Sequence, residues 1–124
     1  MPGRLGGRQG AGRPTVKAKP VRLTPGDGYV ECPIEEATHV TLRIPGPTGL
    51  LTLPVIRSGP RAGTPCWTWN GSTDAPTLRP SVLTEGHRGT HSFRCHSWIN
   101  DGAAQFLGDC SHNMAGTTVP LLDV

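Results

Sequence analysis

Apolar and polar residues alternate along most of the chain. In residues 39–44 (His-Val-Thr-Leu-Arg-Ile), the apolar side chains fall at 40, 42 and 44, which is the period of a strand with one buried face. Gly or Pro interrupts every stretch of ten residues except within 34–44 and 90–101, and both of these contain alternation of period two. The pattern predicts strands at Tyr29–Cys32, His39–Ile44, Leu50–Ile56, Cys66–Asn70, Thr77–Thr84, Phe93–Asn100, Ala103–Asp109 and Thr117–Leu122. We therefore predict an all-β fold, a small sandwich or partly open barrel of short antiparallel strands.

The first 26 residues differ from the rest in pattern and in charge. They show no apolar periodicity, are rich in Gly and Pro, and carry six basic residues and no acidic one. Residues 27–124 carry six Arg and nine Asp or Glu, so the net charge of +3 hides a basic arm joined to a mildly acidic body. We predict an extended arm over 1–26 and a single β domain over 27–124, because 124 residues are too few for two cores. A basic arm suits an acidic partner surface, and a solvated tail is the alternative.

Four cysteines are present, and no apolar segment at the N-terminus has the pattern of a signal peptide. No stretch is long and apolar enough for a membrane span. We therefore expect a reducing compartment, in which thiols or metal ligands are more common than disulfides.

The dipeptide Asp101-Gly102 lies between two alternating runs and predicts a two-residue type I′ turn. That turn places Asn100 opposite Ala103, and it separates the side chains of this hairpin into two faces. One face carries Cys95, Ser97, Ile99, Ala104, Phe106, Gly108, Cys110 and His112. The other carries His96, Trp98, Asn100, Gln105, Leu107 and Asp109.

Two thiols and one imidazole on a single face make up three of the four ligands of a tetrahedral zinc site. We predict a structural zinc ion bound by Cys95, Cys110, His112 and Cys32, with His39, Cys66, His87 and His91 as other sources of the fourth ligand. Buried free thiols and a Cys95–Cys110 disulfide are the alternatives.

The C-terminal half contains an ordered series of short motifs. They are Trp67-Thr-Trp-Asn-Gly-Ser72, Pro76-Thr-Leu-Arg-Pro-Ser-Val82, Cys95-His-Ser-Trp-Ile-Asn-Asp-Gly102, Gln105-Phe-Leu-Gly-Asp-Cys-Ser-His112 and Ala115-Gly-Thr-Thr-Val119. Over residues 65–124 the chain resembles a family of small phage and prophage proteins of unknown function, often mislabelled "ammonia monooxygenase". The resemblance implies a phage origin and a compact zinc-associated β domain. A relative of this domain also occurs beside bacterial ubiquitin-like conjugation genes, which leaves a hydrolytic role open.

Other groups of residues could carry chemistry. His96 and Asp109 share a face of the predicted hairpin and could act as a general base pair with Ser97 or Ser81 nearby. We interpret the pair as a surface hydrogen bond, and Ser81 as no nucleophile, because no strand–elbow–helix context surrounds it. Trp67 and Trp69 alternate on one face and are interpreted as core residues.

These observations favour attachment over catalysis. We expect a phage structural or accessory protein, a capsid-decorating or head-associated subunit located in the virion or the host cytoplasm, which attaches to a capsid protein assembly through its basic arm and can form homo-oligomers. No specific nucleic-acid binding and no membrane contact are expected, since the arm lacks aromatic residues for base stacking. The alternatives are a small zinc-dependent, peptidase-like hydrolase that uses His96 or Asp109, and a cytosolic anti-defence binding protein.

Overall fold

The computed structural model describes residues 16–56 and 66–124. They form the strands β1 (Ala18–Thr24), β2 (Gly28–Glu31), β3 (His39–Ile44), β4 (Gly49–Ile56), β5 (Trp67–Trp69), β6 (Leu78–Arg88), β7 (His91–Asn100), β8 (Ala103–Phe106) and β9 (Thr118–Pro120), and the 3-10 helix η1 (Ile34–Glu36). Each strand predicted from the alternating pattern overlaps an observed one, and β1 is the strand that the pattern did not predict.

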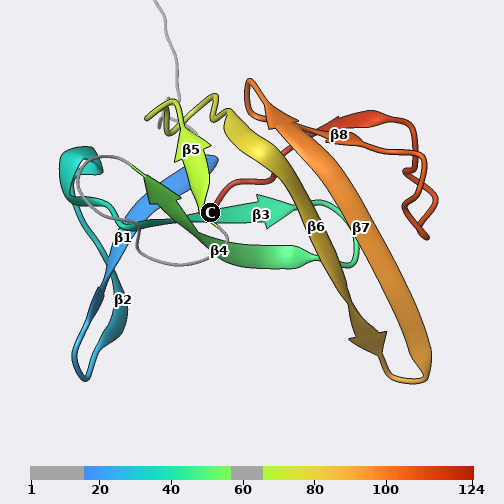
Figure 1. Ribbon diagram of the computed structural model, residues 1–124, viewed down its shortest axis with the longest axis horizontal. Coiled ribbons are helices and arrows are strands. Elements are labelled where there is room, and N and C mark those ends of the chain that lie inside the picture. The colour runs from blue at the N-terminus through green and yellow to red at the C-terminus, as the bar shows by residue number, and fades with distance from the viewer. Residues whose placement is uncertain (1–15, 57–65) are drawn as a thin grey trace, which may run out of the picture.

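The nine strands of the described residues form one sheet with the order β2-β1-β3-β4-β5-β6-β7-β8-β9 (Figure 1). Neighbouring strands are antiparallel except β4 and β5, which run parallel. The all-β prediction is confirmed: the sheet is open and mixed, and no α-helix occurs within 16–56 or 66–124. In the same ranges, no helix is long and apolar enough to cross a membrane.

One face of the sheet encloses a single apolar core. Its largest side chains with almost no exposure include Leu42 from β3, Leu78 from β6, Ile99 from β7 and Phe106 from β8, so both halves of the sheet contribute. Strand alternation supplies this core, because every second residue is buried from Val40 to Ile44 in β3 and from Cys95 to Ile99 in β7, while the residues between them are more exposed. After β9 the backbone bridges back to β3, where the Leu122 N–H donates to the Arg43 carbonyl at 3.0 Å. Trp67 and Trp69 are core residues, as predicted.

The folded body begins earlier than the charge pattern predicted. Within the predicted arm of residues 1–26, β1 pairs with both β2 and β3, and it buries Ala18 and Val21. Lys17 donates to the Leu121 carbonyl and pairs with Asp123 at 3.2 Å, so its charge is used within the chain. The sequence pattern missed β1 because Lys19, Pro20 and Arg22 interrupt its apolar positions. Residues 1–15 of the predicted arm lie outside the described residues.

β6 and β7 form a long twisted ribbon on one side of the molecule (Figure 1). Arg88 pairs with His91, so Gly89 and Thr90 make a two-residue turn, and the φ of 62° at Gly89 suits the first position of a type II′ turn. Nearer the core the register shifts between Leu78 and Val82, so that three residues, 79–81, lie opposite Trp98. Such a bulge re-aims side chains, and Pro80, which has no N–H for the ladder, lies in it.

The predicted turn between β7 and β8 is confirmed. Asp101 and Gly102 have φ values of 47° and 79°, and Asn100 pairs with Ala103 as expected. Gly102 also approaches other backbone closely: its N–H donates to the Pro76 carbonyl, and an added Cβ would lie 3.1 Å from the Asp74 carbonyl oxygen. The turn is therefore joined to the segment that leads into β6.

His39 is expected to make stability depend on pH. Its ring is buried in β3, with Nδ1 2.8 Å from the Thr38 hydroxyl and the Tyr29 ring edge-on at 4.9 Å. Burial lowers the pKa of His39 below its ordinary value of 6.5. The unfolded chain then binds this proton more readily than the folded one, so stability is lost as the pH falls below about 6.5 and continues to fall until the lowered pKa is reached.

Melting temperatures of the parent protein and of His39→Gln at pH 7.5 and 5 measure this effect. We expect a smaller acid-induced drop for His39→Gln. His91→Gln, at an exposed position, should keep the drop of the parent. An equal drop in the parent and His39→Gln would contradict the assignment.

Candidate active site

The open face of the β6–β7 ribbon brings a serine and a histidine together. Ser81 Oγ lies 2.9 Å from His96 Nε2. Ser81 belongs to the bulged segment of β6, and His96 lies on β7 opposite Leu83. Both side chains are partly exposed, whereas their neighbours Val82, Cys95 and Ser97 are buried on the core face.

A carboxylate lies against the other nitrogen of the same ring. His96 Nδ1 is 3.1 Å from Asp109 Oδ2 and 3.2 Å from Oδ1. Asp109 follows β8, in the turn formed after Phe106. Arg94 contacts the same carboxylate at 3.5 Å and pairs with Glu85 at 2.9 Å, so it helps to hold Asp109 beside the ribbon.

The contacts of His96 with Asp109 and Ser81 determine which ring nitrogen carries the proton. An ionised carboxylate only accepts hydrogen bonds, so the Asp109 contact requires the proton on His96 Nδ1. Nε2 then carries a lone pair and accepts the hydrogen bond that the Ser81 hydroxyl donates. The hydrogen bond from His96, assisted by the charge of Arg94, holds the pKa of the Asp109 carboxyl below its ordinary value. The acid therefore stays ionised, and the serine faces a base oriented by a third group.

The segment after β8 is fixed to the backbone of His96. The Leu107 N–H donates to the His96 carbonyl at 2.9 Å. The Cys110 thiol accepts from the His96 N–H at 3.3 Å and donates to the His96 carbonyl at 3.2 Å. One residue further on, the Ser111 N–H donates to the Arg94 carbonyl, and the Arg94 N–H donates to Ser111 Oγ. Asp109 therefore lies in a turn that is held to β7 on both sides.

Two of the predicted zinc ligands are in contact. His112 Nε2 is 3.3 Å from Cys95 Sγ, and the His112 ring packs edge-on against Phe106 at 4.8 Å. Burial is the main reason why the pKa of the Cys95 thiol is raised, and the neighbouring Cys110 thiol also raises it. A raised pKa keeps the thiol protonated, whereas metal ligation uses the thiolate.

Of the other predicted ligands, Cys110 lies near Cys95, and its thiol is also bonded to the His96 backbone. Cys32 lies just after β2, and β2 is at the far edge of the sheet from β7 (Figure 1). His87 and His91 lie at the exposed end of the β6–β7 ribbon. Within residues 16–56 and 66–124, no group of three or more His, Cys, Asp or Glu side chains could hold a metal ion as it stands. Zinc binding stays a prediction, and all four cysteines are free thiols in the structure.

A hollow of about 260 Å³ opens on the same face of the sheet as the Ser81–His96 pair. It is lined by Arg79, Trp98, Asn100 and Gln105. Trp98 lies two residues along β7 from His96, and residues two apart on a strand share a face. The hollow is therefore adjacent to the serine.

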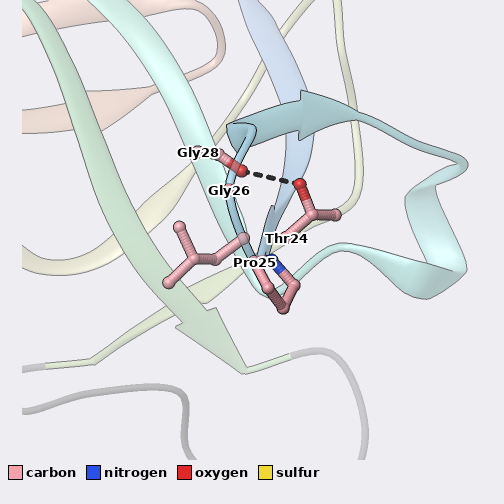
Figure 2. Close-up of a pocket in the computed structure, with 5 residues that line it drawn as sticks. Thr24, Pro25, Gly26 and Gly28 are labelled. Atoms are coloured by element: carbon pink, nitrogen blue, oxygen red, sulfur yellow. Dashed lines mark hydrogen bonds between the residues drawn. The ribbon is translucent and has the colours of Figure 1, made fainter.

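A second hollow lies at the β1–β2 turn and is lined by Leu23, Thr24, Pro25, Gly26 and Gly28 (Figure 2). The Thr24 hydroxyl donates to the Gly28 carbonyl across it at 3.1 Å. It holds neither a nucleophile beside a base nor an ionisable side chain. The Ser81–His96–Asp109 cluster is therefore the better candidate for catalysis.

The sequence predicted the Ser81–His96–Asp109 cluster only in part. It put His96 and Asp109 on one face, and the structure shows them in contact. Their interpretation as a surface hydrogen bond left out Ser81, which was set aside because a helix-linked elbow was expected. The two-residue turn at Gly89-Thr90 was the signal that could have pointed to Ser81. This turn pairs Arg88 with His91, and the same register carried along the two strands places Ser81 diagonal to His96.

Comparison with known families gives one match. A family model described as "Bacterial ubiquitination-like system serine protease (BubE)" matches residues 15–107, which are 93 of the 124 residues. Ser81 and His96 lie within the match, and Asp109 follows it by two residues. No curated protein and no solved structure matches the chain significantly.

This match corrects two sequence-based expectations and favours a third. The resemblance to phage proteins of unknown function over residues 65–124 is wrong, because the matching family is a different one and covers the N-terminal strands as well. The expectation of a capsid-decorating or head-associated phage protein is therefore also wrong. The peptidase-like alternative agrees better with the family.

Proposed function

The chain belongs to the BubE family of serine proteases of bacterial ubiquitination-like systems, and from this premise we propose that it hydrolyses amide bonds in the proteins of such a system, with Ser81 as nucleophile, His96 as general base and Asp109 as the orienting acid. The observation that carries the proposal is the pair of contacts on one imidazole ring. Ser81 Oγ lies 2.9 Å from Nε2, and an Asp109 oxygen lies 3.1 Å from Nδ1.

The proposed reaction has two halves. Ser81 Oγ attacks the carbonyl carbon while its proton passes to His96 Nε2, and the protonated ring then gives that proton to the leaving nitrogen as the C–N bond breaks. A water molecule next attacks the acyl–Ser81 ester, again losing its proton to Nε2, and Ser81 leaves with that proton. Asp109 stays ionised throughout and stabilises the positive charge that forms on the ring.

Covalent labelling of the serine tests this proposal. A fluorophosphonate should modify Ser81 alone, as located by peptide mass spectrometry, because only an activated serine reacts quickly with it. The label should be absent from Ser81→Ala and much slower to form in His96→Ala. Labelling at a different serine, or none in the parent protein, would contradict the proposal.

Cys110 is expected to act as a positioning residue. Its thiol bridges the N–H and carbonyl of His96, so Cys110→Ala should loosen the turn that carries Asp109. Small displacements of this kind can cost about 10²-fold in rate. We expect kcat to fall by about 10- to 100-fold with little change in KM, and Cys110→Ser to restore part of the loss because a hydroxyl can also donate and accept.

Cys32→Ala is the matched control, since Cys32 lies at the far edge of the sheet. It should keep the kcat of the parent protein. A Cys110→Ala variant with normal kcat would show that the backbone alone fixes the turn.

A further inference from the structure

Arg79 is held in place beside the proposed nucleophile. The bulge of β6 places both Arg79 and Ser81 opposite Trp98. The Arg79 guanidinium lies over the Trp98 ring, 5.1 Å from its centroid, and Nη1 donates to the Leu78 carbonyl at 2.7 Å and to the Ile99 carbonyl at 3.4 Å. A stacked and anchored guanidinium loses little freedom on binding a ligand.

The charge of Arg79 has no acidic partner among the described residues. Lys17, Arg22 and Arg94 do have one, whereas Arg43 and Arg88, like Arg79, donate to backbone carbonyls. The Arg79 contacts use Nη1, so Nε and Nη2 remain as donors of a side chain that lines the hollow. A guanidinium with two donors side by side matches the two oxygens of a carboxylate.

The other residues of the hollow also supply donors. The Asn100 amide donates to Gln105 Oε1 at 3.1 Å, which leaves the second Asn100 N–H and the Gln105 amide group for a ligand. No Asp or Glu lines the hollow. Its charge and its donors therefore favour an anion, and its volume of about 260 Å³ suits a side chain of the size of Asp or Glu.

The position of the hollow relates it to the bond that would be cut. Trp98 is two residues from His96 along β7, and Arg79, which stacks on Trp98, lies in the same bulge as Ser81. Two residues of a regular strand span about 6.5 Å, which is also the repeat between alternate side chains of an extended peptide. A substrate whose carbonyl lies at Ser81 would thus place a nearby side chain over Arg79.

We propose that the hollow formed by Arg79, Trp98, Asn100 and Gln105 is a substrate subsite that binds a carboxylate close to the scissile bond, with Arg79 as its specificity-determining residue. This inference rests on the proposed function of Ser81. The carboxylate can come from an Asp or Glu side chain or from a free chain end, and the experiment separates these sources.

Cleavage of a peptide library by the full chain, mapped by mass spectrometry, tests the subsite. One arm uses peptides with both ends blocked, and the other uses the same peptides with a free C-terminus. We expect kcat/KM to be about ten-fold higher or more for Glu than for Gln at one fixed position near the cut, because a charge-assisted hydrogen bond is gained. A preference for Glu over Gln in the blocked arm identifies the side chain, whereas faster cleavage of the free than of the blocked peptides, equal for Glu and Gln, identifies the chain end.

Variants assign the preference to Arg79. Arg79→Gln should lower kcat/KM for the Glu peptide to that for the Gln peptide, so that the ratio of the two falls to about one, and Arg79→Glu should shift the preference toward Lys. Gln105→Glu places a negative charge in the hollow without touching the Arg79 anchors, and it should reduce the preference as well. Arg22→Gln, on β1, is the matched control and should keep it.

A second measurement covers the case in which short peptides are poor substrates. Aryl phosphonates that carry a Glu or a Gln side chain should inactivate Ser81 at rates that differ in the same direction. Equal rates for Glu and Gln together with equal cleavage of the free and the blocked peptides, with Ser81 still labelled by a fluorophosphonate, would overturn the subsite and leave the proposed function standing. An Arg79→Gln variant that slows all substrates by one factor would also overturn it, because Arg79 would then act on the oxyanion. Absence of Ser81 labelling would instead defeat the proposed function.

Discussion

Replacing Ser81 with alanine is expected to reduce hydrolysis by about 10⁴- to 10⁶-fold, the range found when the nucleophile of a serine protease is removed. Without Oγ no acyl–enzyme ester can form, and His96 has no proton to receive. The rate should be measured with a peptide found by library cleavage, at substrate concentrations below KM, where kcat/KM is read directly. The loss should appear in kcat, since Ser81 is half-buried and its removal leaves the Arg79 hollow intact.

Two observations keep this result from being confused with misfolding. Ser81→Ala should melt at nearly the same temperature as the parent, because only one hydroxyl with a single side-chain contact is lost. Ser92→Ala, at an exposed position of β7, should retain full activity. A Ser81→Ala variant with more than about a hundredth of the parent rate would exclude Ser81 as the nucleophile.

Replacing Asp109 with asparagine is expected to lower kcat by about 10⁴-fold, the magnitude seen when the acid of such a triad becomes an amide. The carboxylate can only accept, and it therefore keeps the proton on His96 Nδ1. An amide can donate to Nδ1, which moves the proton to Nε2 and removes the lone pair that accepts from Ser81. Fluorophosphonate labelling of Ser81 should slow by a similar factor.

Asp109 is exposed, so the change should have little effect on folding. Asp27→Asn, at an exposed position of the β1–β2 turn, controls for the loss of one negative charge and should be fully active. If Asp109→Asn keeps the parent rate of Ser81 labelling, then Asp109 does not orient His96, and the contact is a surface hydrogen bond as the sequence analysis interpreted it.

The sequence predicted the strands well where alternation was regular. β3 was placed at its observed bounds, and the Asp101-Gly102 turn gave the correct register of β7 and β8 because both turn positions need a positive φ. β1 was missed since Lys19, Pro20 and Arg22 interrupt its apolar positions, although Pro20 is itself buried. The burial of β1 depends on pairing with β3, which is a tertiary contact that no local pattern reports.

The candidate site was harder to predict for two physical reasons. Three residues of β6 lie opposite one residue of β7 around Ser81, so strict alternation does not apply there. After Phe106 the chain turns instead of continuing as an extended strand. The turn keeps the Cys110 thiol near Cys95, but it also directs the Asp109 carboxylate to the His96 ring and bonds Cys110 to the His96 backbone. The contact of Asp109 with His96 therefore depends on how the chain leaves β8, which strand alternation does not report.

The β6–β7 ribbon also affects how readily the candidate site is lost on heating. Ser81, His96 and Asp109 all belong to this ribbon and to the turn held against it, while the end of the ribbon near Gly89 is exposed and lacks the core beneath it. Paired strands without a packed face are only marginally stable, and such regions open locally before the whole molecule unfolds. Opening that begins at Gly89 first has to break the hydrogen bonds that join Arg88 to the Pro47 carbonyl and Thr84 to Thr48, in the turn between β3 and β4. These two contacts are therefore expected to set how far the hairpin can open on heating before His96 is displaced.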